Sequence, residues 1–476
     1  MDGYQQRGGG GRGNRFFSQD IDGEGSQGRF YAAMEVPELD EEELDRDTAP
    51  PTRMHDPIHL ECVAADWLDR LKGAVAPDEF WGQVPLSVIS LDDDDLIYQA
   101  RRKGGKPGDI AWLEIYVRRA PPGEGNGSQF NQLLGAGTRV HVEFEGIRGF
   151  GAPSSPMNDY WLPHEYARPF RGLPDGLDTR LSEVAGVAVF DVGQGACQAL
   201  MAVERDYLVP VLYVDVGGGV MQNKRTFPDE FTGFCGGVPI ILSHWDWDHW
   251  SSVSRFPRLL ESHWVAPVPP DKPIQQALAW ILLGMGQLSL WMPGMANTYR
   301  TKNLLLERCT GKTTNDSGIA LTLFGGLRRT KRCLLPGDAG YRHIPSVMAG
   351  ARFNSLSVSH HGGRLHSKVV PTPRRGAIAA CSVGAGNSYK HPFWETVEAH
   401  VEQGWSTPIP TGLFGHRPSH VFLPWEGKPK VVSASCGFSQ ECSVAFAVAA
   451  AQGITHQPVT NTVKVIRRSR RPMAPA

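Results

Sequence analysis

The sequence predicts an α/β fold, in which an αββα sandwich follows a small β-containing accessory domain and a disordered N-terminal tail. At 476 residues the chain is long for one domain, so two folded units plus tails are expected. From about residue 184, short apolar runs alternate with glycine and polar residues. Helical patterns at Gln275 to Leu283 and Phe393 to Gln403 interleave with these runs, so helices should cover the faces of a sheet.

The first 56 residues are rich in Gly, Arg, Gln, Asp and Glu, and include the acidic run Glu41 to Glu43. Such a composition cannot bury enough apolar surface to fold alone, so residues 1–56 are predicted to be a disordered tail. The stretch from Arg7 to Arg15 resembles arginine-glycine segments that contact RNA or DNA, although a plain flexible tail has the same composition. Protein partners reached through this N-terminal region are a further expectation.

Residues 57–180 are predicted to form the accessory domain. An amphipathic helix is expected around Val63 to Leu71. Strands are expected at Leu86 to Leu91, Trp112 to Val117 and Arg139 to Phe144, with the four aspartates from Asp92 to Asp95 as a turn. The sequence gives no direct indication of what this domain does.

Residues 181–430 are predicted to form the main domain, in which polar residues gather directly after apolar strands. The expected strands and the residues that follow them are Val187 to Phe190 before Asp191, Val211 to Val214 before Asp215, Pro239 to Leu242 before His244, Cys333 to Leu335 before Asp338, and Ser355 to Val358 before His360 and His361. Polar residues that cluster past the C-terminal ends of strands place a functional edge on one side of a sheet.

The composition narrows the class of protein. Lys and Arg number 48 against 50 Asp and Glu, a formal charge of −2, which argues against a surface coated in positive charge for nucleic acid. No apolar stretch is long enough to span a bilayer, and eight scattered cysteines without a CxxC pair indicate a reducing compartment. A cytoplasmic protein without membrane contact is therefore expected. Residues 431–476 are predicted to be a C-terminal extension with a basic tail.

A dense group of metal-ligand side chains follows the third of these strands. The hexapeptide His244-Trp-Asp246-Trp-Asp248-His249 holds four such residues. Along an extended segment positions i and i+2 face the same way, so His244, Asp246 and Asp248 can converge while the tryptophans point elsewhere. His249 would enter at the start of the next helix. Four ligands this dense predict a metal site.

Distant residues are needed to complete the metal shells. Asp338 follows a strand and a Pro-Gly pair and is of the right type to bridge two cations. His360 or His361 would supply an imidazole from another strand end. Taken alone, Asp338 would more often be a turn residue, and the histidine pair would more often be packed or exposed. Together with the hexapeptide they complete a metal centre.

Six motifs in order resemble the metallo-β-lactamase superfamily, and within it the hydrolase domain of ComEC-type DNA-uptake proteins and their soluble relatives. They cover somewhat under half of the chain. The motifs are FDVGQG (190–195), SHWDWDH (243–249), NDSGIAL (315–321), LLPGDA (334–339), VSHHGG (358–363) and SVGAGNSYKHP (382–392).

The resemblance implies Asp248 and His249 on one metal, His244 and Asp246 on the other, and Asp338 between them. His360 or His361 would close the shell. No counterpart of the family's third-motif histidine lies between His249 and Asp338, where the only histidine is His263, expected to be packed rather than ligating. One tightly bound ion is therefore an alternative to two.

The resemblance also implies roles for residues around the metal. Asp191 would orient a ligand histidine, and a turn-forming aspartate is the alternative. Asn387 and Tyr389 belong to the late motif, in which His391 would face the substrate or else cap a helix. The expected cofactor is a divalent cation, zinc or manganese, because Asp246 adds an oxygen donor where the superfamily usually has a histidine.

The resemblance, together with the oxygen-rich ligand set, implies a metallohydrolase, most directly a phosphodiesterase or nuclease acting on nucleic acid or nucleotides. A metal-bound water, its pKa lowered from 15.7 toward roughly 7, would attack phosphorus as hydroxide, with Asp246, Asp248 and His391 as the catalytic residues. Two alternatives stay open: a small-molecule ester, amide or thioester hydrolase of the same fold, and a non-catalytic assembly or sensor protein that uses the fold as a binding module.

Overall fold

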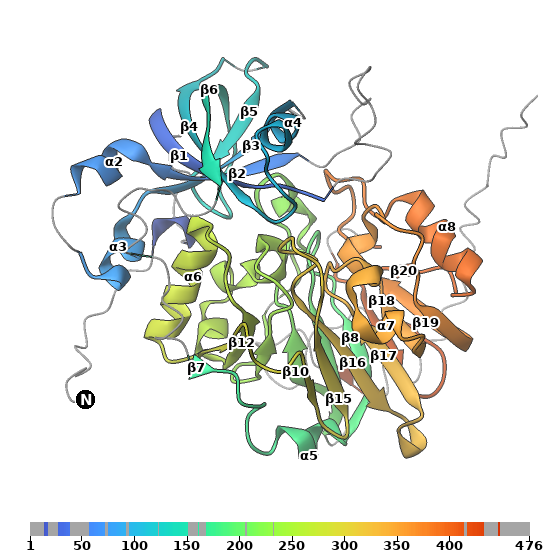
Figure 1. The fold of residues 1–476 in the computed structure, drawn as a ribbon. Helices are drawn as coiled ribbons and strands as arrows, with labels where there is room; N and C mark the ends of the chain where they lie inside the picture. The colour runs from blue at the N-terminus through green and yellow to red at the C-terminus, as the bar shows by residue number, and fades with distance from the viewer. Residues whose placement is uncertain are drawn as a thin grey trace, which may run out of the picture.

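The computed structural model describes residues 14–17, 27–38, 57–71, 75–91, 95–121, 123–150, 160, 168–204, 207–231, 233–413, 417–432 and 446–447. These residues contain both helices and strands, which confirms the prediction of a mixed α/β chain (Figure 1). The strands form one closed barrel and two sheets. The helices are α2 (Ala65–Arg70), α3 (Pro77–Gln83), α4 (Asp95–Arg102), α5 (Leu177–Leu181), α6 (Pro273–Gly284), α7 (Pro345–Met348) and α8 (Trp394–Gln403).

The barrel is built by the first six strands, in the order β1-β2-β3-β5-β6-β4. They are β1 (Gly28–Glu35), β2 (Ile58–Ala64), β3 (Leu86–Leu91), β4 (Ile110–Arg119), β5 (Gly127–Phe130) and β6 (Thr138–Phe150). Because side chains alternate along a strand, Leu60 and Cys62 of β2 face the barrel core while His59 and Glu61 face the rest of the protein.

The prediction that residues 1–56 form a disordered tail is wrong for two described segments. Strand β1 closes the barrel by pairing antiparallel with both β2 and β4, and Phe16 is buried in the main core. Phe30, Ala32 and Met34 of β1 point into the barrel. The composition of the whole segment hid this short alternating run, whose stability comes from pairing with distant strands rather than from local sequence. The other residues of the segment lie outside the described chain.

The boundary predicted at residue 180 is also displaced. Strand β7 (Arg168–Pro169) pairs parallel with β13 (Leu288–Trp291) of the second sheet. Leu177 and Leu181 of α5 are buried in the core between the two sheets. The chain thus leaves the barrel after β6, and residues 168–181 belong to the part that follows.

The two remaining sheets contain mixed parallel and antiparallel strands. The second sheet runs β22-β21-β8-β9-β10-β11-β12-β13-β7, with β23 (Phe446–Ala447) paired to β10. Its other strands are β8 (Val184–Val189), β9 (Gln198–Glu204), β10 (Tyr207–Val214), β11 (Ile240–Ile241), β12 (Trp264–Pro267), β21 (His420–Pro424) and β22 (Lys430–Val432).

The third sheet runs in sequence order from β14 to β20. Its strands are β14 (Thr298–Arg300), β15 (Leu304–Arg308), β16 (Ile319–Gly325), β17 (Lys331–Leu335), β18 (Arg352–Ser357), β19 (Thr372–Cys381) and β20 (Ile409–Pro410). Strands β17, β18 and β19 are parallel, as are β10, β11 and β12. The polar residues that follow these strands therefore emerge at the C-terminal ends of two parallel groups.

One apolar core joins the two sheets, and helices lie on their other faces. Leu200 and Val211 of the second sheet pack with Leu306 and Leu321 of the third. Helix α6 packs against the outer face of the second sheet and beneath the barrel, whereas α7 and α8 lie beside the third sheet (Figure 1).

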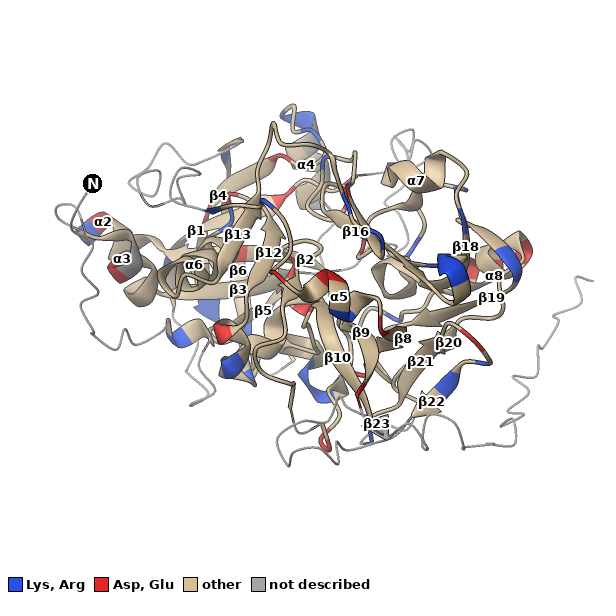
Figure 2. Cartoon of the chain, turned by 90° about the horizontal axis from the view of Figure 1, so that it is seen from below, with Lys and Arg blue, Asp and Glu red and all other residues tan. Residues whose placement is uncertain are grey.

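Charged residues are spread over the described surface. Figure 2 shows Lys and Arg interspersed with Asp and Glu on both the barrel and the sheets. Among the described residues, no helix is both long and apolar enough to cross a membrane. The six described cysteines are free thiols.

A buried histidine gives the fold a testable pH dependence. His420, at the start of β21, is fully buried and its Nδ1 accepts a hydrogen bond from the Asp191 amide at 3.0 Å. Burial lowers its pKa to about 3. Between that value and the ordinary histidine pKa of about 6.5, only the unfolded chain binds the proton, so stability falls as the pH falls.

We expect His420→Asn, which keeps an acceptor for the amide, to remove this pH dependence. Wild type should lose about 1.4 kcal/mol more stability than the variant when the pH is lowered from 7.5 to 5.5. Urea unfolding of both proteins at the two pH values measures the difference. Parallel losses in the two proteins would show that His420 is not the responsible group.

Candidate metal centre

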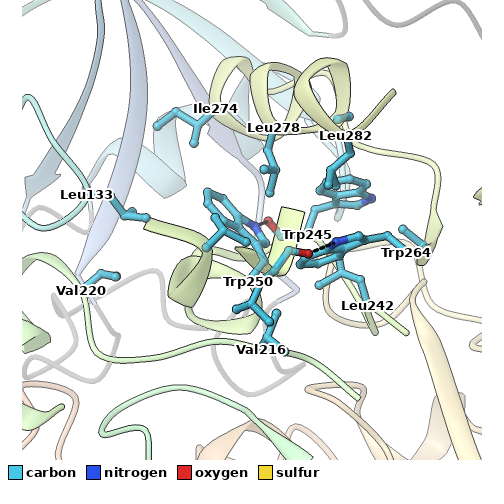
Figure 3. Packing of buried hydrophobic residues seen from close by; sticks show 14 of the residues in the cluster. Leu133, Val216, Val220, Leu242, Trp245, Trp250, Trp264, Ile274, Leu278 and Leu282 are labelled. Atoms are coloured by element: carbon cyan, nitrogen blue, oxygen red, sulfur yellow. Dashed lines mark hydrogen bonds between the residues drawn. The ribbon is translucent and has the colours of Figure 1, made fainter. Parts of the chain in front are cut away.

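The hexapeptide is held in place by Trp245 and by two tryptophans outside it that pack beside Trp245. Trp245 is buried beside Trp250 and Trp264 under helix α6, where Leu278 and Leu282 pack on them (Figure 3). The indole of Trp250 donates to the carbonyl of Trp245 at 2.8 Å, and that of Trp245 donates to the Pro267 carbonyl at 2.8 Å. With Trp245 fixed in the core, the alternating side chains His244 and Asp246 are turned to the opposite side. Trp247 begins a 3-10 turn (Trp247–His249) and lines the same pocket as Asp246 and Asp248, so the prediction that the tryptophans point elsewhere is wrong for Trp247.

One group of ligand atoms contains Asp248, His249 and His361, which lie close enough together to hold one ion. The His361 Nε2 atom lies 3.2 Å from Oδ2 of Asp248, and His249 Nε2 lies 4.0 Å from Oδ1 of the same carboxylate. Oδ1 of Asp338 is 3.0 Å from His249 Nε2 and 3.7 Å from His361 Nε2.

A second group, His244, Asp246 and His360, lies on the other side of Asp338. Oδ2 of Asp338 is 3.9 Å from His244 Nε2 and 3.7 Å from His360 Nε2. Oδ2 of Asp246 is 3.6 Å from the same nitrogen of His244. Asp338 therefore presents one oxygen to each group of histidines. The ligand atoms of His244, His249 and Asp338 also lie close enough together to hold one ion.

The structure also separates the two members of the histidine pair. His361 is buried and faces both Asp248 and Asp338, whereas the side chain of His360 is 31% exposed and approaches only the outer oxygen of Asp338. Both residues have positive φ angles, 51° and 53°, so the tight turn after β18 aims the neighbouring side chains at the same centre.

The buried histidines have the hydrogen-bonding pattern of metal ligands. The Nδ1 atoms of His249, His361 and His244 lie 2.8 Å from Asp215 Oδ2, 2.9 Å from the Ser382 carbonyl and 3.0 Å from Ser243 Oγ. Their Nε2 atoms are buried and make no aligned hydrogen bond with any described residue. A metal-bound imidazole is held in this way, with one nitrogen anchored and the other turned to the ion. The residues present therefore fit a divalent cation.

The electrostatics of the centre also favour a cation. Burial raises the pKa of Asp338, but the His249, His361 and His360 rings outweigh it and hold this pKa well below its ordinary value. Burial lowers the pKa of His361, but Asp338 and Asp248 outweigh it and raise this pKa. The buried carboxylates thus depend on positive charge from their neighbours, which a divalent ion would also supply.

Asp215, not Asp191, contacts a histidine of the centre. Asp215 Oδ2 lies 2.8 Å from His249 Nδ1, and its oxygens accept from the Ser243 amide at 2.7 Å and hydroxyl at 2.8 Å. Asp191 accepts instead from the Ser419 amide at 2.9 Å and the Gly193 amide at 3.2 Å. The prediction for Asp191 is therefore corrected: it fixes the loop after β8.

Residues of the late motif shape the opposite rim. Asn387 donates to the carbonyl of His391 at 2.8 Å and accepts from its amide at 3.0 Å, so it holds the loop that carries His391. The His391 ring lies 5.6 Å from the His360 ring and 6.5 Å from that of His361. Burial, together with His360 and His361, lowers the pKa of His391 to about 3. Tyr389 points to the barrel, where its hydroxyl lies 3.2 Å from His59 Nε2.

His263 lies apart from the centre. Its Nε2 atom is 3.3 Å from the Ser289 hydroxyl at the start of the neighbouring parallel strands. This agrees with the expectation that it is a packing residue and that it does not replace the third-motif histidine.

A lysine links the barrel to the metal centre. Lys272 Nζ lies 3.5 Å from Asp246 Oδ1, 3.5 Å from Glu35 of β1 and 3.8 Å from Glu61 of β2. Burial lowers the pKa of Lys272, but these carboxylates outweigh it and raise the pKa above its ordinary value. One oxygen of Asp246 is thereby held by Lys272 while the other faces His244.

Glu61 also holds two other parts of the main domain. Its carboxylate accepts from the Ile274 amide at 2.9 Å, in the first turn of α6, and from the Trp247 indole at 3.2 Å. A carboxylate at a helix N-terminus satisfies free N–H groups and the helix dipole. The barrel therefore fixes both α6 and the hexapeptide.

A pocket of about 360 Å³ opens between the barrel and the metal centre. Its lining includes Asp246, Asp248, Asp338, the His360/His361 pair and His391 from the centre. The barrel contributes Glu35, His59 and Glu61 to the same pocket. A pocket of this size suits a small ligand or one unit of a longer one.

Four functional residues were missed by sequence reasoning. Asp215 follows a strand and precedes three glycines, a pattern shared with the ligand strands, so the signal was present. The alternation His59-Leu60-Glu61-Cys62 indicates a strand with one polar face, but it does not indicate which part of the protein that face contacts. Lys272 lies in no recognisable motif.

No protein-family model matches the sequence, and no curated protein matches it. Among solved structures, the chain is similar to zinc-bound PqqB from Methylobacterium extorquens, with 8% identity and a TM-score of 0.27 over 47% of this chain and 98% of that one. It is also similar to MEM-A1, a subclass B3 metallo-β-lactamase from a soil metagenome library, with 13% identity and a TM-score of 0.21 over 41% and 83%. Likeness at this level decides nothing about the chemistry of the centre.

We expect Asp215→Asn to weaken binding of zinc or manganese by ~10- to 100-fold, because the neutral amide has a single accepting oxygen. That oxygen cannot accept from both the Ser243 amide and His249 Nδ1–H, which Asp215 serves with two oxygens. Asp191→Asn is the matched control and should bind metal as wild type does. Competition with a chromophoric chelator measures both affinities. A loss in the Asp191 variant alone would return the orienting role to that residue.

Lys272→Met should destabilise the protein by ~3–5 kcal/mol, since it leaves buried Glu61 without its cation. Lys331→Met is the control, because Lys331 pairs at 3.9 Å with the largely exposed Glu426, and its loss should cost under ~1 kcal/mol. Urea unfolding measures both. Equally small losses of unfolding free energy in both variants would mean that the ion pairs of Lys272 with Glu35, Glu61 and Asp246 do not hold the barrel in place.

Proposed function

We propose that the chain is a metallo-β-lactamase-superfamily hydrolase of the ComEC-like branch, and that it cleaves phosphodiesters in nucleic acid or nucleotides. The observation that carries this proposal is the position of Asp338, whose two oxygens face two separate groups of histidines at 3.0 to 3.9 Å. The six ordered motifs of the sequence support the same assignment, and so does the proposed αββα arrangement of the two sheets and their helices.

These contacts support two cation positions, and one tightly bound ion is the alternative. Asp248, His249 and His361 would hold one ion, His244 and Asp246 the other, and Asp338 would lie between them, with His360 beside the second position. At the second position Asp246 supplies an oxygen donor where the superfamily usually has a histidine, which favours manganese or zinc. When bound, a divalent cation would polarise the phosphoryl group and lower the pKa of a water molecule.

The chain's own residues would then orient the reactants. Asp215, Ser243 and the Ser382 carbonyl fix the ligand rings, so the centre needs little rearrangement during the reaction. His391, positioned by Asn387 and lining the pocket, would hydrogen-bond the substrate on the side facing the histidine pair.

A phosphodiester is favoured over a neutral ester because an arginine, Arg364, lines the same pocket as the centre. The two other Lys and Arg side chains of the lining are already paired with carboxylates, Arg342 with Glu38 and Lys272 with Glu35, Glu61 and Asp246. Fixed cations beside a metal centre stabilise the charge of a phosphoryl group that gains negative charge in the transition state.

Metal content and hydrolysis together test this function. We expect purified wild type to contain zinc or manganese and to cleave labelled single- or double-stranded DNA, RNA or bis-(p-nitrophenyl) phosphate. His244→Ala and Asp338→Ala should lose at least ~100-fold in activity, because each removes a ligand. His263→Ala, a histidine outside the centre, should keep wild-type activity.

Equal activity in all four proteins would exclude the centre from catalysis. Cleavage of a lactone, thioester or lactam without cleavage of any diester would make the chain a small-molecule hydrolase. Metal binding without turnover of any substrate would favour a binding module.

A further inference from the structure

Three aromatic side chains from distant parts of the chain meet on the barrel side of the pocket. His59 comes from β2, Trp247 lies between the ligands Asp246 and Asp248, and Tyr389 belongs to the late loop. The His59 ring lies 5.1 Å from Trp247 and 6.3 Å from Tyr389, both edge to face. All three line the pocket and are half-buried, so part of each ring faces its interior. We call these three residues the aromatic wall.

The aromatic wall is held rigidly. The Trp247 indole donates to Glu61 at 3.2 Å, and the Tyr389 hydroxyl contacts His59 Nε2 at 3.2 Å and the Gln222 amide at 3.4 Å. The His391 ring is only 5.7 Å from Tyr389, which connects the wall to the histidines of the metal centre. Rigid rings lose little conformational entropy when a ligand binds, so they suit recognition of a flat group.

The wall and the centre have complementary chemistry. The centre suits the phosphate of a substrate, and the wall offers ring faces and edges within the same pocket of about 360 Å³. A purine or pyrimidine is the flat group that a nucleotide carries next to its phosphate. Base stacking on aromatic side chains is strong and tolerates any base.

We propose that the aromatic wall is a nucleoside-binding subsite, which holds the base of the nucleotide whose phosphodiester lies at the metal centre. This rests on the proposed function and deepens it, since it makes the substrate a nucleotide with an unpaired base. The barrel is then part of the active site, because His59 reaches the substrate from β2. A base that is paired and stacked within a duplex would not enter the wall.

Two p-nitrophenyl diesters, one carrying a nucleoside and the other a methyl group in its place, test the subsite. Thymidine 5′-(p-nitrophenyl phosphate) carries a base, and methyl p-nitrophenyl phosphate does not, while both release p-nitrophenol. We expect wild type to prefer the thymidine ester by ~10-fold or more in kcat/KM. His59→Ala should bring this ratio down toward one. His59→Gln should also lower the ratio toward one, because glutamine keeps a polar amide near the Tyr389 hydroxyl but has no ring.

His141→Ala is the matched control, since His141 is a half-buried barrel histidine on β6 outside the pocket, and it should keep the wild-type ratio. Equal kcat/KM for both esters in wild type, or a ratio unchanged in both His59 variants, overturns the subsite while leaving the hydrolase in place.

Calorimetry with thymidine 5′-monophosphate separates the two proposals. If neither ester is cleaved but the nucleotide binds and His59→Ala weakens binding by ~10-fold, the subsite stands and the hydrolase proposal falls. If neither ester is cleaved and wild type does not bind the nucleotide, both fall.

Discussion

The centre depends on one buried carboxylate that needs positive charge on both sides. Asp338 is 7% exposed, and its two oxygens face different pairs of histidines. A desolvated carboxylate is costly unless cationic or hydrogen-bonding partners surround it. The parallel strands β17 and β18 and the loop after β11 bring those partners to one edge of the sheets. The buried tryptophans that pack against the hexapeptide fix the conformation of this loop, so its ligand side chains stay directed at Asp338.

The barrel is tied into this arrangement rather than standing apart from it. Glu35 and Glu61 share Lys272 with Asp246, and Glu61 also holds the first turn of α6. A change in the barrel that moves β2 would therefore also shift Asp246, a candidate metal ligand, through Lys272. The same strand brings His59 to the pocket. The β2 face that is turned away from the barrel core therefore contributes a charged side chain, Glu61, and a ring, His59, to the surroundings of the centre.

Much of the centre could be predicted from local sequence because its residues follow strands in dense or repeated patterns. The strand predicted at Leu86 to Leu91 has the bounds of β3, and the hexapeptide, Asp338 and the histidine pair come together as expected. What failed depended on partners far along the chain. Strand β1 is stabilised by pairing with β4, Lys272 acquires its role from barrel carboxylates, and Asp215 rather than Asp191 meets His249 only because β10 and β11 are neighbours. Of these residues only Asp215 has a local signal, its position directly after a strand, and that signal does not identify its partner.

The capping of α6 by Glu61 has a consequence for biosynthesis. A ribosome releases Glu61 long before Lys272 and Ile274, although domains generally begin to fold as they emerge, N-terminal first. Until α6 appears, the barrel carries a carboxylate whose amide and ammonium partners do not yet exist, at a surface that the finished protein buries. The barrel face and the metal centre are therefore expected to mature together, late in translation, and a barrel expressed alone would leave this carboxylate hydrated.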